Sequence, residues 1–336
     1  MKLPEALFKL GAALLLAVCV AGAWFVFELY SFKRNPVNLS QAQMFVVEPG
    51  ASLHSIARQL QDKGIIENPR YLTLLGRWHG NAARLQAGEY RLEPGIRPLE
   101  ILDKMEAGEV VQYALTIVEG WNFRELLQAV SQHPKLQHTL SGLSGAQIMQ
   151  LLGAPGQHPE GRFLPETYHF SAGLTDLDFL KRAYEAMTAV LEREWQQRAE
   201  GLPYESSYEA LIMASIIEKE TGVPEERPQI AGVFVRRLER NMRLQTDPTV
   251  IYGLGETFDG DIRRRDLRRD TPYNTYTRHG LPPTPIALPG ADAIHAALHP
   301  ASGDSLYFVS KGDGSHHFSA TLEEHINAVR QYQLNR

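Results

Sequence analysis

The apolar positions of the chain begin with one almost continuous run near the N-terminus. Residues 7–30 hold only two charged side chains, Lys9 near the start and Glu28 near the end. About 20 apolar residues suffice to cross a bilayer. A cleaved signal peptide is the alternative, but Trp24–Phe27 continue the run past the small residues where cleavage would occur. We predict a transmembrane helix over residues 7–30, preceded by a tail over residues 1–6.

A near-repeat follows a polar segment that we place as a linker at residues 31–43. The tetrapeptides Val47-Glu-Pro-Gly50 and Leu92-Glu-Pro-Gly95 each stand between strand-like residues and an amphipathic helical pattern. A looser third copy begins at Val118. These strand–turn–helix units predict a small α+β module over residues 44–115. The module resembles LysM-type glycan-binding modules, and a spacer that binds nothing is the alternative.

Residues 116–336 form the larger part and mix both kinds of periodicity. Apolar positions recur at helical spacing in four segments, which we predict as helices: 122–131, 176–199, 206–220 and 225–240. Residues 306–309 and 317–319 predict a pair of strands joined by the turn Gly312-Asp-Gly314. Local signals also predict two helix N-caps, at Ser52 and at Thr321, the latter with Glu324 at the spacing of a capping box. The predicted fold class is α+β.

Composition excludes several classes of function. The net charge is −5 and the basic residues are dispersed, so no face suited to nucleic acid is predicted. The arginines between 263 and 269 are interleaved with aspartates, which indicates a solvated, self-paired loop. The single cysteine, Cys19, excludes an internal disulfide, and no Cys/His spacing is typical of zinc. We therefore expect no cofactor and no metal.

Glu218 is the first candidate for chemistry. It stands at the end of an apolar helical run, on the same predicted face as Leu211, Ala214 and Ser215. A carboxyl group on a buried stripe loses hydration, which raises its pKa. A carboxylic acid that keeps its proton near neutral pH suits general acid catalysis. A capping or solvated glutamate is the alternative on the helix alone.

Three loops rich in proline, glycine and polar side chains follow Glu218, within residues 243–253, 272–276 and 280–290. Stiff loops hold side chains in place at low entropic cost, and amide, hydroxyl and aromatic groups suit a sugar ligand. Each residue could equally serve a turn, a cap or packing. We nevertheless predict the following as substrate-binding residues: Gln245, Thr246, Asp247, Tyr252, Asn274, Thr275 and Tyr276.

Several motifs together resemble the YceG-like family of endolytic murein transglycosylases. They are Ala214-Ser-Ile-Ile-Glu-Lys-Glu-Thr221, the run Arg243–Gly253, Tyr273-Asn-Thr-Tyr276, Gly280-Leu-Pro-Pro283, Phe163-Leu-Pro-Glu-Thr-Tyr168, residues 291–300 and the apolar span. The resemblance covers nearly the whole chain. It implies a single-pass protein of the bacterial inner membrane that cleaves nascent peptidoglycan glycan strands near the cell-wall synthases. It also implies that Glu218 is the catalytic acid.

The charges flanking the span are nearly balanced, so the orientation rests on this implied chemistry. We expect a cytoplasmic N-terminus and a periplasmic catalytic domain over residues 116–336.

A hydrolytic glycosidase usually needs two carboxylates, whereas a lytic transglycosylase needs one. Glu220, two residues after Glu218, points away from it on a helix and is expected to be solvated or capping. Asp247 is the other motif carboxylate, and its place before Pro248 fits a turn equally well. We therefore predict a transglycosylase in which Glu218 serves as acid and then as base. The alternatives are a lysozyme-type hydrolase and a glycan-binding scaffold without activity. The absence of ligand clusters disfavours a metal-dependent hydrolase.

Overall fold

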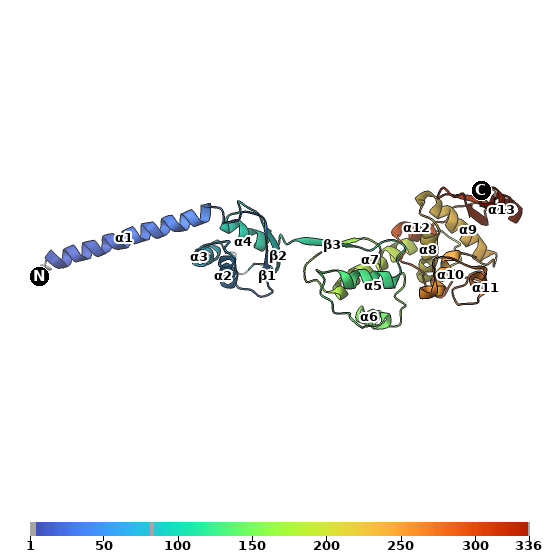
Figure 1. Cartoon of the computed structure of the whole chain (residues 1–336), viewed down its shortest axis with the longest axis horizontal. Helices are drawn as coiled ribbons and strands as arrows, with labels where there is room; N and C mark the ends of the chain where they lie inside the picture. The colour runs from blue at the N-terminus through green and yellow to red at the C-terminus, as the bar shows by residue number, and fades with distance from the viewer. Residues whose placement is uncertain (1–4, 81–83, 335–336) are drawn as a thin grey trace. The chain divides into compact units, whose positions relative to one another are not determined.

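The computed structural model describes residues 5–80 and 84–334, which divide into two compact units (Figure 1). The first unit comprises residues 1–113 with Phe170–Gly173, and the second comprises Ala114–His169 with Leu174–Arg336. The division after Tyr113 lies close to the one expected from the sequence. Most of the predicted tail, residues 1–4, lies outside the described residues.

Helix α1, Glu5–Arg34, contains the apolar run. It is long and apolar enough to cross a membrane, and the side chains of its apolar window are exposed. The linker predicted over residues 31–43 is shorter in the structure. Residues 31–34 continue α1, and Val37 is buried in the core of the first unit.

The rest of the first unit contains two paired strands. Two helices lie between these strands in the sequence, and a third helix follows them. Strands β1 (Gln43–Val47) and β2 (Gly88–Leu92) are antiparallel, with Phe45 opposite Tyr90. The helices are α2 (Leu53–Asp62), α3 (Pro69–His79) and α4 (Pro98–Ala107). Their inward faces form one core with both strands, in which Phe45, Ile56, Leu60 and Tyr90 are fully buried. The resemblance to LysM modules stays a prediction.

The near-repeat has a structural counterpart. Strands β1, β2 and β3 (Gln112–Thr116) are each followed by a glycine with positive φ and then by a helix. Those glycines are Gly50, Gly95 and Gly120, with φ of 78°, 89° and 78°. A residue with a side chain rarely adopts this conformation, so glycine allows the turn from strand to helix. The N-cap prediction at Ser52 is confirmed, because its hydroxyl accepts a hydrogen bond from the N–H of Ser55 at 3.1 Å.

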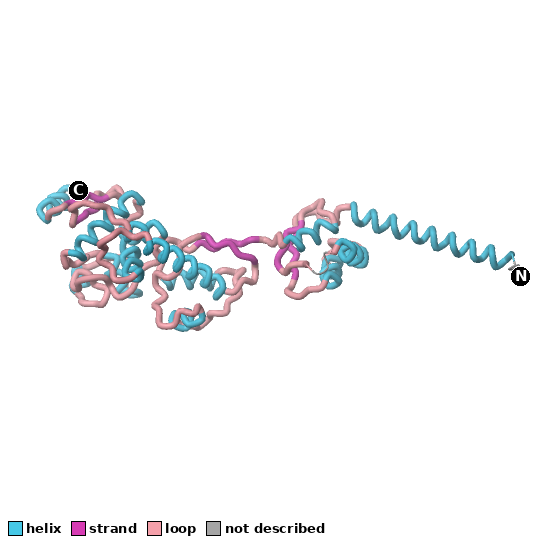
Figure 2. Tube along the Cα trace, turned by 180° about the vertical axis from the view of Figure 1, so that it is seen from behind, coloured by secondary structure: helices cyan, strands magenta, loops and turns pink. Residues whose placement is uncertain are grey.

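The second unit is mostly helical, and the chain as a whole mixes helices and strands (Figure 2). Strand β3 pairs with β4 (Thr167–Ser171), and β5 (Tyr307–Ser310) pairs antiparallel with β6 (His316–Ser319). The helices are α5 (Phe123–Gln132), α6 (Gly145–Leu151), α7 (Asp176–Gln196), α8 (Ser207–Glu220), α9 (Arg227–Glu239), α10 (Asp247–Leu254), α11 (Arg264–Arg268), α12 (Ala291–Leu298) and α13 (Leu322–Val329).

Helix α8 is central to this unit, packing against α7, α9, α10 and α12 (Figure 1). Residues 210–217 are all buried, so the helix is covered on every side rather than along one stripe. The four predicted helices are present with slightly different ends. The β-branched residues 249–251 lie in α10, which tolerates Pro248 because it stands in the first turn, where a missing N–H costs no helical hydrogen bond. The capping box of Thr321 and Glu324 is confirmed at α13.

Candidate active site

Glu218 lies in the last turn of α8, where the chain leaves the helical core. The helix ends after Glu220, because Thr221 adopts extended backbone angles. The Glu218 side chain is only 6% exposed. Its carboxylate accepts a hydrogen bond from the N–H of Gly290, at 3.0 Å, and lies 3.5 Å from the guanidinium of Arg227. Gly290 is the N-cap of α12, so two helices meet at this carboxyl group.

Three carboxylates share the buried guanidinium of Arg227. Besides Glu218, it contacts Glu119 and Asp292, each at 3.4 Å. The pKa of Glu218 is raised, mainly because burial removes water from its charged form. The N–H of Gly290 and the charge of Arg227 act in the opposite direction, whereas Glu119 and Asp292 raise the pKa further. The environment therefore favours a protonated Glu218, as a general acid requires.

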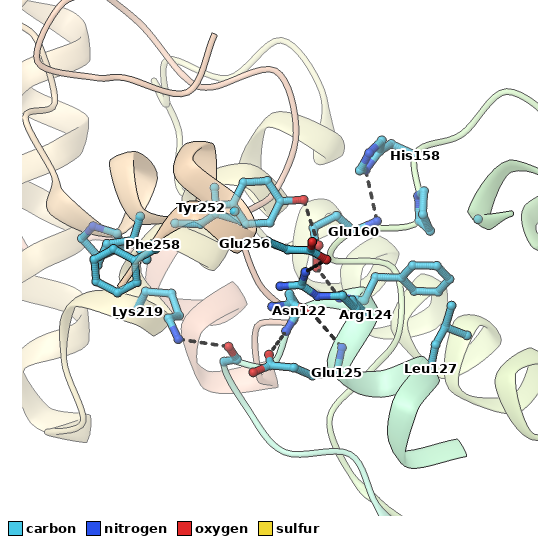
Figure 3. A pocket seen from close by; sticks show the side chains of 18 of the residues that line it. Asn122, Arg124, Glu125, Leu127, His158, Glu160, Lys219, Tyr252, Glu256 and Phe258 are labelled. Carbon is cyan, nitrogen blue, oxygen red and sulfur yellow. Dashed lines mark hydrogen bonds and ion pairs between the residues drawn. The ribbon is translucent and has the colours of Figure 1, made fainter. Parts of the chain in front are cut away.

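A cavity of about 1310 Å³ opens beside Lys219, the residue after Glu218 (Figure 3). Lys219 donates a hydrogen bond to the carbonyl of Gly120 at 3.2 Å at the edge of this cavity. The lining combines polar and charged groups with aromatic rings, including Asn122, Arg124, Glu160, Tyr252, Glu256 and Phe258. Hydrogen-bonding groups beside ring faces match the alternating hydroxyls and C–H faces of sugars.

Glu160 is a buried carboxyl group in this cavity that the sequence analysis missed. It is 3% exposed, and accepts hydrogen bonds from the Tyr252 hydroxyl and the Phe123 N–H, both at 2.9 Å (Figure 3). Burial raises its pKa to about 7, against the lowering effect of these hydrogen bonds. One signal could have found it, since it stands between Pro159 and Gly161 just before a motif that the sequence analysis did use.

Three of the predicted substrate-binding residues, Thr246, Asp247 and Tyr276, lie around Glu220 instead of Glu218. The Thr246 hydroxyl donates to the Glu220 carboxylate. The Tyr276 hydroxyl donates to Asp247 at 2.6 Å beside it. Burial raises the pKa of Glu220 to about 7. The prediction that Glu220 is solvated or capping is therefore wrong, because its carboxylate is desolvated and accepts a hydrogen bond that joins the end of α8 to the loop at Thr246.

Three predicted sugar contacts have side chains that are buried within the protein. Asn274 donates to three backbone carbonyls, of Asp266, Leu267 and Arg269. The hydroxyl of Thr275 accepts the N–H of Thr246 at 3.1 Å and pairs with the hydroxyl of Thr249 at 2.9 Å. These bonds favour a role for Thr246, Asn274 and Thr275 in fastening the loops to each other rather than in touching sugar.

Tyr252, Gln245, Asp247 and Tyr276 keep accessible surface and stay candidates for substrate contact. Only Tyr252 among them lines the cavity. Gln245 is exposed and has a φ of 51°, a strained value for a residue with a side chain. Strain of this kind often occurs at functional sites, which supports its place in the candidate site.

Comparison with known proteins identifies the family of this chain. A model of the YceG-like family matches residues 45–331. The chain belongs to the YceG-like family. An endolytic murein transglycosylase of Bacillus subtilis is 32% identical over 304 residues, covering 85% of this chain and 83% of that protein.

Further relatives extend the comparison. An endolytic murein transglycosylase of Streptococcus pneumoniae is 26% identical over 97% of this chain, which spans 65% of that protein's length. A crystal structure of a YceG-like protein from Listeria monocytogenes is 32% identical, with a TM-score of 0.53 over 86% of this chain and all of that one. The YceG-like fold therefore extends over both units of this chain.

Proposed function

We propose that this YceG-like chain is a membrane-anchored lytic transglycosylase that cuts peptidoglycan glycan strands internally. Its relatives carry the name endolytic murein transglycosylase. The observation that carries the proposal is Glu218, a carboxyl group almost withdrawn from solvent and with a raised pKa, within one of the motifs of the resemblance.

In the proposed reaction, protonated Glu218 donates its proton to the glycosidic oxygen between N-acetylmuramic acid and N-acetylglucosamine. The C1–O bond breaks and the N-acetylglucosamine side leaves as an alcohol. The resulting carboxylate takes the proton of the muramyl 6-hydroxyl, whose oxygen attacks C1 and closes the 1,6-anhydro ring. No water is consumed, and Glu218 ends protonated. A raised pKa serves both steps, because the same group must give up and then recover a proton near neutral pH.

The Arg227 cluster has a definite part in this scheme. Arg227 lies near the Glu218 carboxylate formed after the first proton transfer, and Gly290 donates a hydrogen bond to it. Charge that develops in the reaction therefore meets groups that are already oriented, which lowers the barrier without rearrangement. Glu119 and Asp292 keep Arg227 from stabilising the carboxylate too strongly, so the proton can be recovered from the muramyl hydroxyl.

The hydrolytic alternative gains support from the structure, because Glu218 is not the only carboxyl group at the site. Glu119 contacts the same guanidinium nitrogen as Glu218 and is about half exposed. In a hydrolase a second carboxylate would activate water or attack C1. Because Glu119 is a second carboxylate at the site, a lone carboxylate no longer distinguishes the two reactions, and Glu218 together with the family supports the transglycosylase.

Anchoring is the second part of the proposal. Helix α1 would cross the bacterial inner membrane once, with the cytoplasmic tail before it and the catalytic domain in the periplasm. The cavity would then be in the compartment that holds nascent glycan strands and the cell-wall synthases. Termination of strand elongation would follow from cutting at that point.

The experiment compares purified full-length chain with Glu218→Gln and Glu225→Gln on isolated sacculi, by chromatography of released fragments. Glutamine keeps the shape of Glu218 but cannot donate a carboxylic proton, so release is expected to fall at least about 10²-fold. Glu225 is an exposed glutamate near Arg227, and its variant should cut like the wild type. Full activity of Glu218→Gln would overturn the mechanism, and wild type that leaves strands uncut would favour a glycan-binding scaffold.

A further inference from the structure

Two histidines and a glutamate meet where the end of α7 lies beside α12. Glu194 stands in the last turn of α7, His295 on α12, and His299 just past the end of α12. One potential ligand atom from each lies within 4.8 Å of the other two. None of the three lines the cavity or takes part in the proposed reaction. Their four-residue spacing puts both histidines on one side of the helix.

The geometry of this cluster suits a cation. Glu194 is 11% exposed at its side chain, and its Oε2 lies 2.8 Å from Nδ1 of His295. The carboxylate therefore lies beside a largely exposed imidazole, and the His299 ring lies next to that imidazole.

We propose that Glu194, His295 and His299 form a binding site for a transition-metal dication of the zinc type. Two imidazoles and one carboxylate are a known donor set for Zn²⁺, which then keeps a fourth position for water. The two rings are stacked with centroids 4.3 Å apart, so modest side-chain rotation would aim both at one ion.

Two features of the surroundings bear on the affinity of this site and on the effect of a bound ion. Arg193 contacts the other oxygen of Glu194 at 3.2 Å, and its charge weakens the attraction of the site for a cation. An ion bound here would fasten the end of α12 to the end of α7. Gly290 at the other end of α12 donates to Glu218, so the ion would stabilise the helix that supports the catalytic acid.

The test is a titration of the metal-free full-length chain with Zn²⁺ by calorimetry, repeated with Co²⁺ to read the visible absorption of a bound ion. We expect one ion per chain, and at least a tenfold loss of affinity in His295→Ala and in His299→Ala. His54→Ala, at an exposed histidine of α2, should bind like the wild type. Should the wild type bind no ion, or both cluster variants bind as tightly as it does, the site does not exist.

A second, independent feature lies in the first unit, on the outer face of α3. Tyr71, Leu74 and Trp78 follow each other at three- and four-residue spacing and form one stripe. Leu74 is 41% exposed and Trp78 is 77% exposed, which is unusual for such large apolar side chains. At one end of the stripe, the Tyr71 ring meets the rings of Phe25 and Phe32 on α1 edge-on, each at 5.7 Å between centroids.

We infer that this α3 stripe lies on the outer surface of the bilayer that α1 crosses, an inference that rests on the proposed anchoring. The stripe continues from the apolar helix itself, because Tyr71 contacts Phe25 within the apolar run. Tryptophan and tyrosine favour the boundary between lipid and water. Arg70 and Arg77 are exposed on the same helix, where their guanidinium groups can reach lipid phosphates.

Brominated lipids test this in vesicles that contain the full-length chain. In Trp24→Phe, shallow bromine labels should quench a share of the tryptophan fluorescence, and that share should vanish in Trp24→Phe/Trp78→Phe. Deep labels should quench Trp24 in the wild type, which reports the insertion of α1. If Trp24 is quenched but Trp78 is not, the contact of α3 with the bilayer is overturned alone. If neither tryptophan is quenched, the proposed anchor is overturned as well.

Discussion

At the scale of single residues, the proton affinity of Glu218 is set by a balance of named neighbours. Burial, Glu119 and Asp292 favour the protonated acid, while Gly290 and Arg227 favour the carboxylate. Glu119, Asp292 and Arg227 can each be substituted without touching Glu218, and each substitution has a predictable sign. This makes the pH dependence of cutting a sharper probe than loss of activity.

Glu119→Gln removes a negative charge that raises the pKa of Glu218. The pKa of Glu218 should fall, so the acid loses its proton at lower pH and the alkaline limb of kcat/KM moves to lower pH. Asp292→Asn should move it in the same direction. The measurement is a pH–rate profile on sacculi, with Glu225→Gln as the control that leaves the profile in place. An unmoved limb in Glu119→Gln would show that another group limits the rate.

Glu160 gives a stability prediction. Its pKa of about 7 in the folded chain lies above the ordinary value of 4.5, so the folded state holds the extra proton. The contribution of Glu160 to the free energy of unfolding is therefore fully present below a pH of about 4.5. It is lost as the pH rises through about 7. In Glu160→Gln this fall should be absent. Denaturant unfolding from pH 4 to 8 measures it, and an equal slope in both proteins would contradict the buried acid.

At the scale of elements, the loops after α8 are fastened to each other by buried hydroxyl groups. Thr275→Val removes a hydroxyl that accepts the N–H of Thr246 and pairs with Thr249. Leaving a buried N–H without its partner costs about 1–3 kcal/mol. We expect the free energy of unfolding to fall by that amount, measured with urea. Thr275→Ser keeps the hydroxyl and should lose much less, and equal losses would contradict the hydrogen-bond account.

Elements with local signals could be predicted from the sequence, and environments built by distant contacts could not. Ser52 and Thr321 cap their helices through neighbours three residues away. Glu160 acquires its buried state through Tyr252, which is 92 residues further along the chain. The Thr246 bond to Glu220 likewise joins a loop to a helix across 26 residues. Spacing along the chain carries no record of such contacts.

At the scale of the whole molecule, the proposed anchoring by α1 can be tested directly. As a retained membrane helix, it should keep the protein in membranes washed with alkaline carbonate, whereas a variant lacking residues 1–30 should be released. Intact mass of the protein extracted from cells should include the entire apolar run. A mature protein that begins after the small residues at 21–23 would instead mean a cleaved signal peptide.

The central claim is that Glu218 catalyses cleavage of the glycosidic bond in a reaction that consumes no water. Digestion of sacculi by the full-length chain in water enriched in heavy oxygen tests it most directly, by mass analysis of the new ends. The account predicts that the new strand ends weigh one water less than reducing ends and carry no heavy oxygen. It also predicts that Glu218→Gln produces none of these ends. Reducing ends that carry heavy oxygen would identify a hydrolase and contradict the account.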